Sequence, residues 1–265
     1  MELSHLAISI CVLYSLALVG DAINNHAASL SDEDYWHTVW PNSPIPSGLH
    51  ELSNADPTDV EIKDIPMVIE DTQYLEAFLF FQHDLYPGKT MNVFTNESAS
   101  QTGIFAWIVK DVEKFKTEGY TFKEICKRNG GAYKGQGKYC AKTLGTLIGF
   151  AISKLGKNIH MLSSSFVDKQ GQYTVEGIQN LGEKAVICHR LNFHRIVFYC
   201  HENHGTTTFN VSLVAGNGTK THALAICHDT TGMNHDMLSE ILGVDPGTKP
   251  VCHFLGNKSV LWLPN

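Results

Sequence analysis

The dipeptide Cys-His occurs four times in this chain, and each copy directly follows a short apolar stretch. The copies are Cys188-His189, Cys200-His201, Cys227-His228 and Cys252-His253. Such a stretch predicts a buried strand that ends at the dipeptide. Successive strand residues point to opposite faces of a sheet, so each sulfur and the imidazole beside it are expected on opposite faces.

The paired histidines are candidate metal ligands. Eight of the 14 histidines lie between residues 189 and 253. Imidazole clusters suit copper, zinc, iron and nickel. Zinc is a competing choice, although structural zinc sites place two to four residues between neighbouring cysteines and the closest cysteines here are 12 positions apart. A Cys₂His₂ zinc site stays open if the strands break at the dipeptides. The expected ligands are His189, His201, His228 and His253.

The cysteine count favours disulfides. Of seven cysteines, Cys11 lies in a predicted signal peptide, which leaves six: Cys126, Cys140, Cys188, Cys200, Cys227 and Cys252. An even number in an oxidising compartment is typical of disulfide bonding. A Cys126–Cys140 bridge would join two predicted helices and contribute about 3 kcal/mol in the chain-entropy model. The four cysteines of the dipeptides allow three pairings.

The N-terminal residues resemble a signal peptide over residues 1–22. Leu6 to Val19 is apolar and uncharged but too short to span a bilayer comfortably, and small residues precede the expected cleavage after Ala22. Four glycosylation sequons agree with a secretory-pathway protein of the apoplast, cell wall or vacuole, and they begin at Asn96, Asn210, Asn217 and Asn257. No later segment is apolar enough to predict a membrane span.

Residues 23–70 form an acidic leader that contains five of the nine prolines. Residues 21–76 carry 12 acids and one lysine, a net charge of −11, whereas residues 77–265 carry +5. No basic stretch is dense enough for nucleic acid. We expect an extended leader with few elements of its own, either solvated or docked on the basic domain. Tyr35, Trp36 and Trp40 are its expected anchors.

Residues 71–265 are expected to form a single α+β domain, largely β in its C-terminal part, with short helices and disulfides. Strands are predicted at residues 78–81 and on both sides of the Asn217-Gly218 turn, at 207–215 and 219–227. Helices are predicted from Thr121, carrying Cys126, at 144–155 with Cys140 at its start and Gly156 at its end, and at 234–242.

The spacing of the four dipeptides resembles the plant BURP-domain family. Ten, 25 and 23 residues separate them, and eight more precede Trp262, which is the family's closing motif residue. Asp84-Leu85-Tyr86-Pro87-Gly88 resembles an early family element. The leader's Glu33-Asp34-Tyr35-Trp36 is similar to the seed-protein and aluminium-induced branch.

The residues and the resemblance together lead to three hypotheses about function. Some BURP proteins are copper-dependent peptide cyclases that crosslink a core peptide in their own chain through Trp or Tyr. Residues 100–107 resemble such a core, with Gly103 and Trp107 as crosslinked residues, although Pro does not follow Gln101 and Tyr is missing. This cyclase is the second hypothesis. The first is a non-catalytic protein of stress response or seed development that binds copper through the four paired histidines. A metal-free structural protein of the wall or of storage, with wall polymers as partners, is the third.

Overall fold

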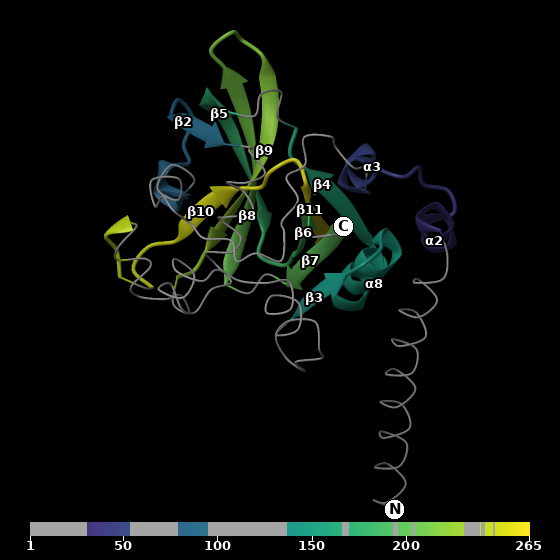
Figure 1. Ribbon diagram of the computed structural model, residues 1–265. Helices are drawn as coiled ribbons and strands as arrows, with labels where there is room; N and C mark the ends of the chain where they lie inside the picture. The colour runs from purple at the N-terminus through teal and green to yellow at the C-terminus, as the bar shows by residue number, and fades with distance from the viewer. Residues whose placement is uncertain are drawn as a thin grey trace, which may run out of the picture.

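The computed structural model in Figure 1 shows two antiparallel β-sheets with helices beside one of them. It describes residues 31–53, 79–94, 137–165, 170–192, 196–202, 205–230, 239, 242–245 and 247–265. Within these ranges, none of the helices combines the length and apolar character that crossing a membrane requires. The predicted α+β class, with a largely β C-terminal part and disulfides, is confirmed.

The six-stranded sheet has the order β1-β10-β9-β8-β5-β2. Its strands are β1 (Leu79–Phe81), β2 (Thr90–Phe94), β5 (Gln170–Gly182), β8 (Thr206–Ala215), β9 (Lys220–His228) and β10 (Val251–Phe254). A short 3₁₀ turn, η1 (Gln82–Asp84), follows β1. The strand predicted at residues 78–81 is confirmed, and so is the hairpin of β8 and β9 around Gly218, whose φ is 84°.

The five-stranded sheet has the order β3-β7-β6-β11-β4. Its strands are β3 (Lys138–Ala141), β4 (Ile159–Ser163), β6 (Val186–Asn192), β7 (Ile196–Glu202) and β11 (Ser259–Pro264). Each of the four Cys-His pairs lies in a strand, two in each sheet: β6 and β7 in this one, β9 and β10 in the other. The prediction that each dipeptide ends its strand holds to within one residue for β7, β9 and β10, but it is wrong for β6, which continues to Asn192 and pairs with β7 over those residues as well.

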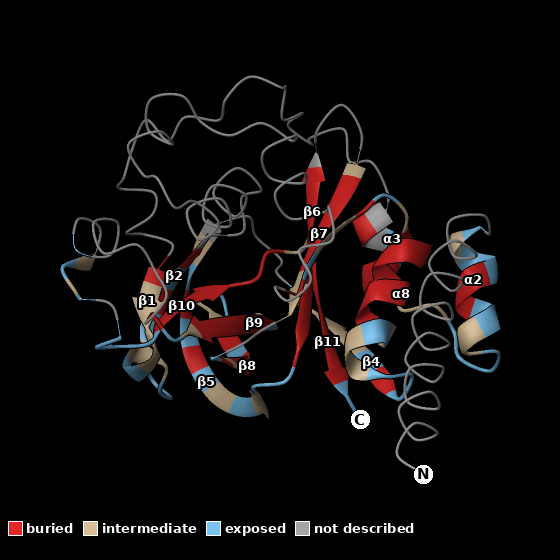
Figure 2. Ribbon diagram, turned by 90° about the horizontal axis from the view of Figure 1, so that it is seen from below, coloured by how far each residue is buried: buried red, intermediate tan, exposed pale blue. Residues whose placement is uncertain are grey.

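Alternation along these strands separates two apolar layers. Val186 and Cys188 of β6 pack in a cluster with helix α8 (Leu144–Leu155), on the outer face of the five-stranded sheet. Ile187 points the other way and joins Leu224 and Ile226 of β9, so a second cluster fills the space between the two sheets. The central strands β6 and β11 of this sheet consequently consist mainly of buried residues, shown in red in Figure 2, whereas the edge strands β3 and β4 include exposed ones.

Helix α8 agrees with the sequence prediction at both ends. Thr143 is its N-cap, where the hydroxyl accepts from the Thr146 amide at 3.1 Å. Gly156 ends it with a φ of 86°, a conformation that favours glycine. The prediction that Cys140 lies at the start of this helix is wrong, because Cys140 lies in β3. The apolar stretch begins only after the cap at Thr143, and the preceding residues pair with β7 instead.

The leader is more ordered than the proline content predicts. It contains two short helices, α2 (Asp32–Val39) and α3 (Ser47–Ser53), so the expectation of an extended segment is wrong there. Tyr35 and Trp36 are buried in the cluster around α8, which confirms them as anchors. The helix predicted from Thr121 and the boundary at residues 70/71 lie outside the described residues, as does most of the helix predicted at 234–242.

Candidate functional site

Two disulfides join neighbouring strands at the dipeptides. Cys188 of β6 is directly opposite Cys200 of β7 and bonded to it. Cys227 of β9 is likewise opposite Cys252 of β10 and bonded to it. The structure thus selects one of the three pairings that the sequence left open. Cys140 is also disulfide-bonded, and Cys126, its predicted partner, lies outside the described residues.

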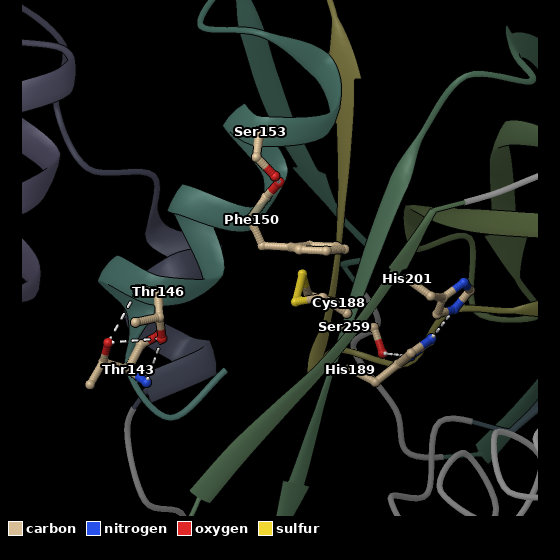
Figure 3. Close-up of a disulfide and its surroundings, with 9 residues drawn as sticks. Thr143, Thr146, Phe150, Ser153, Cys188, His189, His201 and Ser259 are labelled. Carbon is tan, nitrogen blue, oxygen red and sulfur yellow. Dashed lines mark hydrogen bonds between the residues drawn. A yellow bond between two sulfur atoms is a disulfide. The ribbon is translucent and has the colours of Figure 1, made fainter. Parts of the chain in front are cut away.

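Sulfurs and imidazoles occupy opposite faces, as predicted. In Figure 3 the sulfur of Cys188 lies towards Phe150 of α8, whereas His189 and His201 lie on the far side of the strands. His189 follows Ile187 on the inner face of β6, and His228 follows Ile226 on that of β9, so both continue the layer between the sheets. The imidazoles therefore gather at one end of the inter-sheet core.

The four imidazoles form two close pairs, one from each sheet. The Nε2 atoms of His189 and His201 are 3.3 Å apart. Those of His228 and His253 are also 3.3 Å apart. The ring planes of each pair are nearly parallel, with interplanar angles of 20° and 11° and centroids 5.4 Å apart in both. Strand register causes this arrangement, because the two imidazoles of each pair lie diagonally across neighbouring strands, one on either side of the opposed cysteines.

Every Nδ1 atom of the four imidazoles has an oxygen partner. In the first pair, His189 Nδ1 is 2.9 Å from Ser259 Oγ, and His201 Nδ1 is 3.4 Å from the Glu202 carbonyl oxygen. In the second pair the partners are Thr206 Oγ1 at 3.3 Å from His228 and the Phe254 carbonyl oxygen at 3.3 Å from His253. The oxygen at each Nδ1 atom thus orients the ring, as is usual for metal-binding histidines.

Burial keeps these imidazoles neutral. It lowers the pKa of His201 and of His253 to about 4, against hydrogen bonds from their rings to backbone carbonyls, which raise it. It also lowers the pKa of His189 and of His228 well below its usual value, and the charges of neighbouring histidines in the cluster add to the effect in both. Neutral imidazole is the form that binds a metal ion.

Each imidazole pair has a geometry that fits two nitrogen ligands of one transition-metal ion. In the part of the chain that the structure describes, no three histidine, cysteine or acidic side chains are already grouped to hold one ion. Two nitrogens bound to one ion at a tetrahedral angle stand about 3.3 Å apart, given metal–nitrogen distances of about 2.0–2.1 Å. Each imidazole pair has that nitrogen–nitrogen spacing.

Trp262, the closing motif residue, lies away from the imidazoles. It is fully buried in β11 and packs in the cluster around α8, on the sulfur side of the sheet. Its ring stacks on Trp40 of the leader at 6.2 Å between centroids. In the described structure it therefore packs against the leader, a contact that the sequence motif alone did not indicate.

Some of the remaining predicted site residues lie outside the described residues, and the others differ in exposure. Gly103, Trp107 and Asn96 lie outside the described residues. Asn217 is exposed in the turn between β8 and β9, whereas Asn210 is partly buried in β8 with its side-chain carbonyl oxygen enclosed. Asn257 is partly buried in the connection from β10 to β11.

Two residues of the site were missed by sequence reasoning, Ser259 and Thr206. Ser259 reaches His189 because β11 pairs with β6 at that register, and Thr206 lies directly opposite His228 in β8. Strand register is not visible in a single sequence, so no local pattern marks either hydroxyl. The nearest signal is that Ser259 belongs to the last strand, three residues before Trp262.

Comparison with known proteins agrees with this architecture. The BURP domain matches residues 120–264. The whole chain is 39% identical to the Unknown seed protein USP of Vicia faba, across 97% of that protein. It is 32% identical to BURP domain protein RD22 of Arabidopsis thaliana over 71% of this chain and 55% of that protein. The chain belongs to the BURP-domain family of plant proteins.

Proposed function

We propose that this protein binds copper through His189, His201, His228 and His253. The observation that carries the proposal is the pairing of four neutral imidazoles, two buried (His189 and His253) and two partly buried (His201 and His228). Their Nε2 atoms face each other while every Nδ1 has an oxygen partner. A structural histidine needs no second imidazole 3.3 Å from its Nε2 atom, and this arrangement occurs twice. The two pairs would each supply two nitrogen ligands.

Copper binding can be tested on the purified protein without its signal peptide. Dialysis against Cu(II), followed by metal analysis and electron paramagnetic resonance, is expected to show bound copper with nitrogen hyperfine structure. A variant with all four histidines changed to Gln is expected to lose both. Equal copper content in that variant and the parent protein would refute the proposal and favour a metal-free structural role. Competition with Zn(II) decides between the two metals.

A control variant replaces histidines that lie outside the cluster. His160 and His222 are exposed and bonded to Asn265 and Ser165, respectively. Changing these two to Gln is expected to leave copper content unchanged. Intact disulfides in all variants, checked by mass after alkylation, show that loss of copper does not come from misfolding.

Peptide cyclisation is the second candidate and is supported by the sequence of residues 100–107. Joining Gly103 to Trp107 removes two hydrogens and reduces dioxygen, and bound copper would supply that electron transfer. Incubation with Cu(II) and oxygen, followed by digestion, is expected to lower the mass of this peptide by two hydrogens, but not in Trp107→Phe. An unchanged mass in the copper-loaded protein would exclude this activity.

We also propose that the protein enters the secretory pathway and acts in seed development or stress response, in the apoplast, wall or vacuole. Two buried disulfides and the predicted signal peptide support the compartment. The similarity to the Unknown seed protein USP supports the role. Fusion of residues 1–22 to a fluorescent reporter is expected to direct it out of the cytosol, and a cytosolic reporter would contradict this.

A further inference from the structure

The two imidazole pairs are built as the same four-membered chain of hydrogen bonds. In the first, Ser259 Oγ is 2.9 Å from His189 Nδ1, the two Nε2 atoms are 3.3 Å apart, and His201 Nδ1 reaches the Glu202 carbonyl. In the second, Thr206, His228, His253 and the Phe254 carbonyl occupy the same places. Each chain runs from a hydroxyl through two imidazoles to a carbonyl.

The carbonyl end fixes the position of one proton. A carbonyl oxygen accepts hydrogen bonds and does not donate them, so His201 and His253 carry their proton on Nδ1. A neutral imidazole has one proton, and the Nε2 atoms of these two rings therefore hold lone pairs. They are the two histidines whose tautomer already presents Nε2 to an ion.

The hydroxyl end must then have the opposite tautomer. Two lone pairs facing each other at 3.3 Å would repel, so His189 donates from its Nε2–H to His201, and His228 donates to His253. The Nδ1 atoms of His189 and His228 are left with lone pairs, which accept from the hydroxyls of Ser259 and Thr206. Half of the proposed ligands are thus protonated at their binding nitrogen in the metal-free protein.

We infer that Ser259 and Thr206 are tautomer-switching hydroxyls for His189 and His228. When Nε2 of either imidazole binds a metal ion, its proton must move to Nδ1, and the hydroxyl then turns from donor to acceptor. A hydroxyl is suited to this because one O–H group donates and accepts with a simple rotation. The imidazole pair neither gains nor loses a proton.

Burial makes the two hydroxyls hard to replace. Ser259 is 2% exposed and Thr206 is 3% exposed, so water has little access to either Nδ1 atom. A side chain without a hydroxyl would leave a buried lone pair in the metal-free state and a buried N–H in the metal-bound state. The second loss acts directly on the ligand, because the group behind a metal-binding imidazole sets its orientation and basicity.

The tautomers can be read directly in the metal-free protein. Long-range ¹H–¹⁵N correlation spectra of ¹⁵N-histidine-labelled protein distinguish protonated from unprotonated ring nitrogens. We expect protons on Nε2 of His189 and His228 and on Nδ1 of His201 and His253. Single His→Gln variants assign the signals. A proton on Nδ1 of His189 in the metal-free protein would overturn the inference, whether or not the protein binds any metal.

The switch itself rests on the proposed metal site and is tested with Zn(II), which is diamagnetic. On binding, the His189 and His228 protons are expected to appear on Nδ1, while those of His201 and His253 stay there. Bound Zn(II) with His189 still protonated on Nε2 would overturn the switch. If neither Cu(II) nor Zn(II) binds, the proposed function fails, and the metal-free spectrum alone decides the tautomer assignment.

Substitutions at Ser259 and Thr206 test the effect of each hydroxyl separately from the effect of the residues around it. Ser259→Ala is expected to weaken Zn(II) binding about 10- to 100-fold and to shift the His189 Nδ1 resonance, and Ser259→Thr to restore both. Ser259 also completes the sequon at Asn257, so Asn257→Gln is the control that removes the sequon and keeps the hydroxyl. Thr206→Val and Thr206→Ser form the equivalent pair for His228. Unchanged affinity and an unshifted Nδ1 resonance in Ser259→Ala would contradict the role.

Discussion

At the level of single residues, the neutral imidazoles of the cluster make the folded protein less stable in acid than at neutral pH. A histidine whose pKa falls on folding binds fewer protons in the folded state than in the unfolded one. The unfolded value is about 6.5, and the folded pKa of His201 and His253 is about 4. Their stabilising contribution is therefore complete above pH 6.5 and is lost as the pH falls towards 4.

This predicts a pH dependence that belongs to the cluster. In metal-free protein, the free energy of unfolding is expected to fall between pH 6.5 and 5, by about 1.5 kcal/mol for His201 alone. Urea unfolding at a series of pH values measures it. The variant with all four histidines changed to Gln is expected to show a much flatter profile. Equal slopes in the two proteins over this window would show that the imidazoles are not buried as neutral groups.

Single residues were also the scale at which the sequence predicted most about the site. The apolar stretch before each dipeptide determines which face the imidazole takes, so the separation from sulfur followed from alternation. The partners of those imidazoles could not be predicted, because Ser259 and Thr206 are brought in by the register of β11 on β6 and of β8 on β9. Register depends on pairing across the whole sheet.

At the level of elements, the leader helices are part of the core. Asp32 of α2 accepts a hydrogen bond from the Gly145 amide at 3.1 Å, in the first turn of α8, where a carboxylate also interacts favourably with the helix dipole. Trp36 donates to the Ser43 carbonyl at 2.9 Å, and Trp40 to the Lys157 carbonyl at 3.2 Å. Composition predicted a loose leader because proline and acids dominate it, whereas a few buried apolar side chains of α2 and α3 and one carboxylate pack it against the domain.

Trp36 tests whether the leader stabilises the domain. Trp36→Ala removes a ring that is 5% exposed and is expected to lower the free energy of unfolding by about 3–5 kcal/mol. The control is His37→Ala, an exposed neighbour in the same helix, with little expected effect. Urea unfolding followed by tryptophan fluorescence and by circular dichroism measures both. A stability for Trp36→Ala within 0.5 kcal/mol of the parent would mean that the leader packs without supporting the fold.

At the level of the whole molecule, the two sheets repeat one arrangement. Each contributes two adjacent strands, a disulfide between opposite residues and an imidazole pair on the inner face. The apolar cluster of Ile187, Leu224 and Ile226 already joins the sheets beside the histidines. An ion held by nitrogens of both pairs would therefore connect the two sheets directly, and it would add its binding energy to the stability of the folded state.

This predicts that metal stabilisation needs both sheets. Copper at about 100 times its dissociation constant is expected to raise the free energy of unfolding by about 2.7 kcal/mol, and a chelator to reverse the gain. If the two pairs share one ion, changing either His189 and His201 or His228 and His253 to Gln removes nearly all of that gain. If each pair binds its own ion, either double variant keeps about half. Thermal unfolding of the parent protein and both double variants, with copper and with chelator, distinguishes a site shared between the sheets from two separate ones.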